Sequence, residues 1–205
     1  MCIKNNELEE HFNIMIDNLT SAKAFFQVYK ALSISVEGKT NYHALQETTQ
    51  NNLYKHFFIT TISGMYKLMF IEIACFFENT SDKKPKIYSI RHFKEILEKN
   101  NQYQIIEKID NRLKKHKKLV KGIKEIRNKL IAHREANVDR NSLYYDINIT
   151  PNNISNLLFD LTTLFREISI DMFGYENSLL FSSPIIEDST YHLLNALNLP
   201  NNLEN

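Results

Sequence analysis

Residues that break helices are scarce in this chain. It contains four glycines and four prolines among 205 residues. Glycine and proline end helices and form most tight turns, and a sheet would need such a turn after nearly every strand. The sequence therefore predicts an all-α fold built from long helices. No change in composition and no proline- or glycine-rich linker divides the chain, so we expect a single domain over residues 1–205.

Apolar spacing places the first two helices. From Leu8 to Tyr29 apolar residues recur at steps of four and three, which predicts a helix over about residues 6–33. A second helix is expected over about 42–78, with Gly64 marking a close crossing by a neighbour. Its apolar part is about as long as a membrane span, but Lys67 and Glu72 lie near the middle, so we expect a buried core helix and no membrane association.

Turn and cap signals divide the rest of the chain. A polar turn at 79–85 precedes a shorter expected helix that ends near residue 100, and a long basic helix follows. Residues 135–149 lose helical periodicity, which predicts one irregular loop in which 142–149 form an extended loop or a short strand. Thr150-Pro151 is typical of a helix start, and Gly174 of its end. A short C-terminal helix then completes an up-and-down bundle.

The sequence offers no cofactor or metal site and no export signal. Cys2 and Cys75 lie far apart without a CxxC motif, and no histidines pair at metal-ligand spacing. The histidines assigned to surfaces or interfaces are therefore His43, His56, His92, His116 and His192. Residues 1–20 carry acids where a secretory signal needs a basic start and an apolar run. We expect a cytoplasmic protein that works without a metal or cofactor.

Positive charge is concentrated in one segment. Residues 108–134 hold eleven lysines and arginines but only two acids, although the net charge of the whole chain is +1. Lys121, Lys124 and Arg134 are the candidate phosphate-binding residues of this segment. A solvated helix face is the alternative for such a charge run, and it stays open at this point.

The basic helix ends in a segment with a chemical pattern, Arg127-Asn128-Lys129-Leu130-Ile131-Ala132-His133. On an ideal helix, Arg127 and His133 flank one apolar seam and are about 120° apart, so one copy would not bring them together. Two copies packed through the seam around a twofold axis would bring Arg127 of each near His133 of the other. Asn128 points away from the seam and could support the helix end.

Arginine and histidine together suit the cleavage of a phosphodiester by proton transfer. Histidine titrates near neutral pH and could remove a proton from a ribose 2′-OH or protonate the leaving oxygen, while a guanidinium could bind the phosphate as charge develops. These roles would make His133 and Arg127 the catalytic residues and RNA the substrate, without a metal. The alternative is that His133 is a packed, hydrogen-bonded residue at the edge of an apolar seam, which is the commoner use of such a histidine.

This segment resembles the Arg-polar-x4-His signature of HEPN domains, and it is most similar to the AbiU-type branch, which is linked to abortive phage infection. A more diffuse similarity covers about residues 55–170, and the most specific part of the domain is 101–174. The resemblance implies an all-α bundle that dimerises with the motif in the interface cleft. It also implies a metal-independent endoribonuclease in many members and an inactive binding module in others. Glu135 stands where some HEPN toxins carry a tyrosine that a partner nucleotidyltransferase modifies.

Three functions therefore remain to be separated. The first is a metal-independent endoribonuclease in phage defence or a toxin–antitoxin system, with RNA, a second copy bound through the motif-bearing helix, and an antitoxin or companion defence protein as partners. The second is a non-catalytic HEPN module that binds RNA or a partner protein. The third is a structural helical dimer in which Arg127 and His133 only stabilise the interface.

Overall fold

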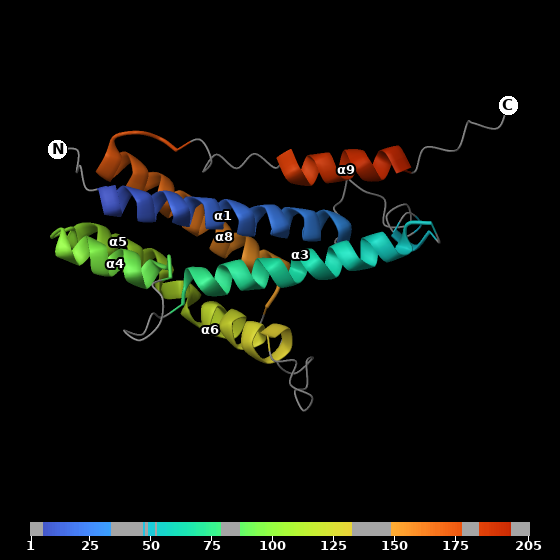
Figure 1. Cartoon of the computed structure of the whole chain (residues 1–205), viewed down its shortest axis with the longest axis horizontal. Coiled ribbons are helices and arrows are strands. Elements are labelled where there is room, and N and C mark those ends of the chain that lie inside the picture. The colour runs from blue at the N-terminus through green and yellow to red at the C-terminus, as the bar shows by residue number, and fades with distance from the viewer. Residues whose placement is uncertain are drawn as a thin grey trace. The chain divides into compact units, whose positions relative to one another are not determined.

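A computed structural model describes residues 6–33, 47, 49–51, 53–78, 87–132, 149–177 and 185–197, and its elements in this part of the chain are helical (Figure 1). The α-helices are α1 (Asn6–Ser33), α3 (Lys55–Phe76), α4 (Ile90–Lys99), α5 (Tyr103–Leu113), α6 (Lys117–Ile126), α8 (Pro151–Phe173) and α9 (Ile185–Leu197). A 3-10 helix, η1 (Lys114–His116), and a π-helix, η2 (Arg127–Ala132), flank α6. The predicted all-α class is confirmed.

The chain forms two compact units. The first contains residues 1–22 and 70–182, and the second contains 23–69 and 183–205. The expectation of a single domain over 1–205 stays a prediction. Each unit has buried apolar residues of its own, and each is described by itself below.

Aromatic packing holds the first unit together. Phe12 of α1 stacks on Phe165 of α8 with ring centroids 5.4 Å apart, and Phe76 and Phe93 approach the same Phe165 ring at 5.4 and 6.2 Å. These four rings are at most 3% exposed. Residues from α1, α3, α4 and α8 therefore share one core, and burying each large apolar side chain stabilises it by roughly 1.5–3 kcal/mol.

The second unit has a smaller core. Ala31, Leu32 and Phe58 are buried together with Tyr191 and Leu194 of α9. Beside this cluster, Lys30 of α1 forms an ion pair of 3.1 Å with Glu187 of α9. The short C-terminal helix expected from the sequence is thus confirmed, and the structure shows which residues it buries.

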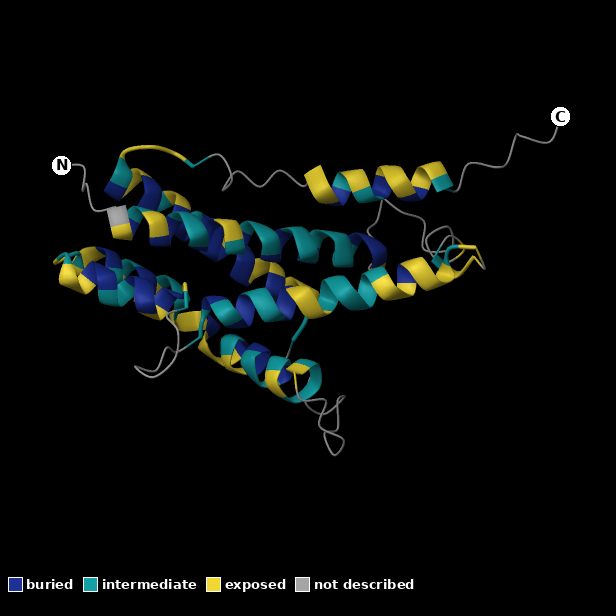
Figure 2. Cartoon of the chain, viewed as in Figure 1, coloured by how far each residue is buried: buried dark blue, intermediate teal, exposed yellow. Residues whose placement is uncertain are grey.

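Helix α3 departs from its predicted form in two ways. It starts at Lys55 instead of near residue 42, because a turn at 53–54 precedes it and Asn51 accepts hydrogen bonds from the peptide N–H groups of Tyr54 and Lys55. It is also less buried than expected: Phe57 is 60% exposed, and buried residues dominate only from Met69 onward (Figure 2). By length and mean hydropathy (1.4) α3 could cross a membrane, and 28% of that apolar window is buried within the protein.

Gly64 does not mark a crossing. A Cβ built on it meets no atom of the described residues within 4 Å, so no neighbour approaches its backbone closely. The prediction of a close helix crossing at this glycine is wrong.

The cap signals around α8 are confirmed. Thr150 accepts a hydrogen bond of 3.2 Å from the peptide N–H of Asn153, and Pro151 occupies the first helical turn. Gly174 ends the helix with φ 74°, a left-handed conformation that favours glycine. Residues 133–148, which include nearly all of the predicted irregular loop, lie outside the described residues.

The basic segment is not the single continuous α-helix expected from its apolar stripe. It is α5, the 3-10 turn η1, α6 and the π-helix η2 in succession. The 3-10 turn is tighter than an α-helix and the π-helix is wider, so the residues on either side are rotated relative to an ideal helix. This rotation decides which lysines share a face.

Candidate functional site

The predicted motif begins where α6 becomes a π-helix. Arg127 is the first residue of η2, which continues to Ala132. A π-helix closes i→i+5 hydrogen bonds and is rare, and short examples are frequent at functional sites. The angle of 120° between Arg127 and His133 assumed an α-helix throughout, so it does not apply past Arg127.

The guanidinium of Arg127 is bound by Glu78. A terminal nitrogen of Arg127 donates a hydrogen bond to a carboxylate oxygen of Glu78, which follows the end of α3. Both side chains are about one-quarter exposed. The Nε of Arg127 is buried and has no hydrogen-bond partner among the described residues. This guanidinium therefore keeps one donor, Nε, without a partner in the described part of the chain, while Glu78 binds a terminal nitrogen.

Lys124 lies next to this pair. Its Nζ donates a 3.1 Å hydrogen bond to the carbonyl oxygen of Phe77 and lies 3.8 Å from the Glu78 carboxylate. Burial lowers the pKa of Lys124. Two cations from the basic segment thus converge on one acid at the end of α3.

Two further ionisable groups lie on α3, and burial acts on both. Burial raises the pKa of Glu72. Burial also raises the pKa of the Cys75 thiol, with the charge of Arg127 opposing and that of Glu72 adding to the shift. The Arg127 guanidinium is therefore close enough to Cys75 to act on it electrostatically, in a site where water is partly excluded.

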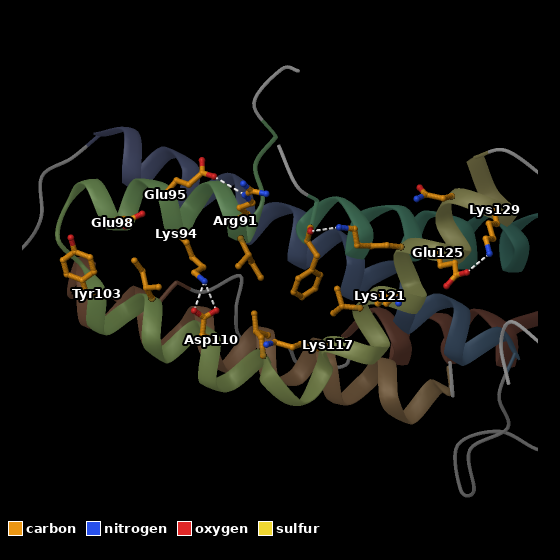
Figure 3. Close-up of a pocket in the computed structure, with 17 residues that line it drawn as sticks. Arg91, Lys94, Glu95, Glu98, Tyr103, Asp110, Lys117, Lys121, Glu125 and Lys129 are labelled. Carbon is orange, nitrogen blue, oxygen red and sulfur yellow. Dashed lines mark hydrogen bonds and ion pairs between the residues drawn. The ribbon is translucent and has the colours of Figure 1, made fainter. Parts of the chain in front are cut away.

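A groove of about 1160 Å³ begins at the motif and lies within the first unit (Figure 3). It is formed by α4, α5, α6 and the start of η2, with Phe77, which directly follows α3. Its apolar lining consists of Phe77, Ile90, Tyr103, Ile106, Leu113 and Val120. Its charged and polar lining consists of Arg91, Lys94, Glu95, Glu98, Asp110, Lys117, Lys121, Lys124, Glu125, Asn128 and Lys129.

Ion pairs engage many of the charged groups of this groove. Figure 3 shows Lys94 bound to both carboxylate oxygens of Asp110 at 2.7 Å. Arg91 pairs with Glu95 at 3.3 Å, and Lys129 with Glu125 at 2.6 Å. Lys117 and Lys121 are exposed and form no ion pair with any described residue. These two lysines add positive charge to the groove that no ion pair within the described part of the chain engages.

The candidate residues from the sequence fall into three groups. Lys121, Lys124 and Asn128 all line the groove. Arg127 lies at its end but is turned toward Glu78 and is not part of the lining. His133 and Arg134 lie outside the described residues, so the separation of the motif arginine and histidine stays a prediction, as does the role of each residue.

Sequence reasoning missed two partners. Nothing in the sequence marks Glu78, 49 residues before Arg127, as a partner of the motif arginine. His116 was assigned to a surface or interface, but it is 7% exposed and its Nε2 lies 2.6 Å from Asp160 Oδ2. Both contacts join residues far apart in sequence, and neither leaves a local spacing signal. Among the described residues, no group of three His, Cys, Asp or Glu side chains could hold a metal ion.

Comparison with known protein families gives one match over most of the chain. The family model HEPN_AbiU2, described as AbiU2, matches residues 5–189, nearly the whole chain. The chain belongs to the HEPN_AbiU2 family. The match includes Arg127, His133 and Glu78, and it covers most of both compact units. The chain matches no curated protein and no solved structure.

Proposed function

We propose that this HEPN_AbiU2 protein is a metal-independent endoribonuclease that cleaves RNA through its 2′-OH, in phage defence or a toxin–antitoxin system. The observation that carries the proposal is the placement of Arg127. It lies in a π-turn at the end of a large groove, is held by Glu78, and has one buried donor, Nε, without a partner in the described part of the chain. A guanidinium in this setting is suited to bind a phosphate whose negative charge increases during cleavage.

Glu78 acts as a positioning residue in this proposal. It fixes one end of the guanidinium, and the remaining N–H donors of Arg127 contact the scissile phosphate. A guanidinium held in place loses little side-chain entropy when the phosphate arrives, which favours the transition state over a freely rotating arginine.

His133 supplies the proton transfers. As a general base it removes the proton of the 2′-OH, whose oxygen attacks the adjacent phosphorus and expels the 5′ oxygen of the next nucleotide. As a general acid it protonates that leaving oxygen. The products are a 2′,3′-cyclic phosphate and a free 5′-OH, and the chemistry uses no oxidant and no metal.

The groove supplies the path for RNA. Lys117 and Lys121 have no ion-pair partner in the described part of the chain, so their charge can replace the counterions of two phosphates. Lys124 binds an RNA phosphate near the cleavage point, and Arg134 contacts a neighbouring phosphate. Asn128 supports the π-turn that carries Arg127. The site is completed by a second copy of the chain, bound through the motif-bearing helix, whose His133 faces Arg127 of the first.

RNA cleavage with defined ends tests this function. Purified protein should cleave single-stranded RNA in the presence of EDTA, leave 2′,3′-cyclic phosphate ends and spare DNA, which lacks the nucleophile. His133→Ala and Arg127→Ala should each lose at least a hundredfold in rate, whereas His56→Ala, an exposed histidine of α3, should retain it. Full activity of His133→Ala would refute the role of that residue.

One observation favours a second candidate, a non-catalytic module that binds RNA. Arg127 is paired with Glu78 and does not line the groove, while Lys117 and Lys121 do. A binding module would use the lysines and leave the Arg127–Glu78 pair as a structural bridge. Intact RNA ends after prolonged incubation, together with binding that is lost in Lys117→Ala and Lys121→Ala, would select this candidate.

A further inference from the structure

A second hollow lies on a different part of the first unit. It is formed by η1, the first turn of α6 and the first half of α8, and it measures about 590 Å³. It is lined by Lys115, His116, Lys118, Leu119, Asn153, Asn156, Phe159 and Asp160, and we refer to it as the η1–α8 cleft. None of these residues lines the groove at the motif. The volume falls within the range of small-ligand sites and fits one nucleotide better than a duplex or a protein segment.

A buried polar pair forms the floor of the cleft. His116 and Asp160 are each 7% exposed, and the carboxylate also accepts an ion pair of 2.7 Å from Lys115. Asp160 is the only acid among the described lining residues. Its ion pair with Lys115 offsets its negative charge. The floor therefore does not repel an anion, and it is held rigidly by two partners on η1.

An aromatic ring forms one wall. Phe159 is 69% exposed, whereas its neighbours Leu157, Leu158 and Leu161 on α8 are at most 3% exposed. Exposing a phenyl ring to water is unfavourable, and Phe159 is the most exposed aromatic among the described residues. An exposed ring beside cations is the arrangement that single-strand binding proteins use to stack an unpaired base.

Polar groups complete the cleft. Lys118 is exposed and forms no ion pair with any described residue, and Asn156 presents an exposed amide one turn of α8 before Phe159. An amide can both donate to and accept from the edge of a base, while an ammonium binds a phosphate. Phe159 and Asn156 thus suit a base, and Lys118 suits the phosphate of the same nucleotide.

We propose that the η1–α8 cleft binds one unpaired nucleotide of single-stranded RNA, with Phe159 stacking on the base, Asn156 bonding to its edge and Lys118 contacting its phosphate. The choice of RNA as ligand rests on the proposed function. The cleft lies apart from the motif groove, so it would anchor the strand at a distance from the cleavage point. Anchoring at two places would favour substrates with an unpaired segment of sufficient length.

The absence of tryptophan from the chain provides a direct test. Phe159→Trp introduces the only tryptophan, which keeps the stacking surface, and its fluorescence should be quenched when 2′-O-methyl oligouridylate is added. This oligonucleotide lacks the attacking hydroxyl and is not cut. Ile170→Trp, a matched change at an exposed position of the same helix outside the cleft, should not be quenched. Equal quenching at both positions, or at neither, would overturn the proposal.

Affinity measurements provide a second test of nucleotide binding in the η1–α8 cleft. Phe159→Ala should weaken binding of the fluorescent oligonucleotide about tenfold, and Ile170→Ala should leave it unchanged. Binding of a blunt RNA duplex should be equal in Phe159→Ala and wild type, because paired bases cannot stack on the ring. Unchanged oligonucleotide affinity in Phe159→Ala would refute the proposal. A larger loss of affinity for an oligoglutamate peptide than for the oligonucleotide would also refute it, because it would indicate an acidic protein partner.

The outcome is separable from that of the nuclease proposal. Phe159→Ala should cleave at the wild-type rate when RNA is saturating, with KM raised about tenfold. If wild type cuts no RNA, the binding measurements still decide whether the η1–α8 cleft binds an unpaired nucleotide. If wild type cuts RNA but Phe159→Ala binds normally, the cleft proposal alone fails.

Discussion

Acidification should destabilise the first unit through one histidine. His11 of α1 is 2% exposed and packs among the rings of Tyr88, His92 and Phe93, with centroids 5.0, 4.6 and 5.9 Å away. The pKa of His11 is lowered from 6.5 to about 4, mainly by burial and in part by the nearby His92, while a hydrogen bond to the Ser89 carbonyl and the charge of Glu7 oppose the shift. The folded protein therefore holds His11 neutral where the unfolded chain would protonate it.

The sign and size of the effect follow from proton linkage. Between pH 6.5 and pH 4 the unfolded state binds more protons than the folded state, so the free energy of unfolding falls as pH falls. Each pH unit in this window costs about 1.4 kcal/mol, which gives about 2 kcal/mol between pH 7 and pH 5. The full destabilisation of about 3 kcal/mol is reached below pH 4, and above pH 7 this destabilisation is absent. A typical domain is stable by only about 5–15 kcal/mol.

Urea unfolding of His11→Leu measures this contribution. The variant should lose about 2 kcal/mol less than wild type when the pH is lowered from 7 to 5, because it has no group to protonate at this position. Ile168→Val, at a buried residue of α8 that does not titrate, should lower stability by about 0.5–1.5 kcal/mol equally at both pH values. Protein concentration is kept fixed throughout, because association would shift the midpoints. An identical pH response in wild type and His11→Leu would refute the reasoning.

Three further predictions concern other parts of the chain. Gly64→Ala should raise the free energy of unfolding by about 0.5–1 kcal/mol in a thermal or urea melt, because the added methyl meets no atom of the described residues within 4 Å and alanine favours the helix; destabilisation would mean that the site is occupied. Asp160→Asn should cost about 1–3 kcal/mol at pH 7, since hydrogen bonds from Lys115 and His116 outweigh the opposing effect of burial and lower the pKa of Asp160. That contribution is present above about pH 4 and lost as the pH falls further, so a difference between variant and wild type that persists in urea melts at pH 2 would contradict it. Glu78→Gln should reduce the RNA cleavage rate roughly tenfold with KM little changed, as expected for a positioning residue, and unaltered turnover would remove Glu78 from the proposed site.

The features that the sequence predicted are those with local causes. The ends of α8 follow from a threonine hydroxyl that caps the first turn and from a glycine that adopts a left-handed conformation, and both act within a few residues. The seam of α1 was predicted because residues three and four apart share a helix face, and Leu8, Phe12 and Met15 are fully buried.

Two kinds of feature were missed: a local departure from ideal helix geometry, and contacts between residues distant in sequence. The π-helix at Arg127 departs from the ideal helix that periodicity assumes, and the apolar stripe carries no sign of it. The contacts of Arg127 with Glu78 and of His116 with Asp160 span 49 and 44 residues, so they exist only once the helices have packed. The candidate residues Lys121, Lys124 and Asn128 could be named from the sequence, but the groove that gathers them could not.

The His116–Asp160 contact has a mechanical consequence. It fixes the joint between α5 and α6, and α6 then extends for ten residues, about 15 Å, before the motif begins. A tilt of α6 by about 4° at η1 would therefore displace Arg127, at the far end of the helix, by about 1 Å. A displacement of that size can slow a reaction on the order of a hundredfold. On the proposed function, the His116–Asp160 contact would thus help Glu78 to position the Arg127 guanidinium, and substitutions that loosen it should lower turnover.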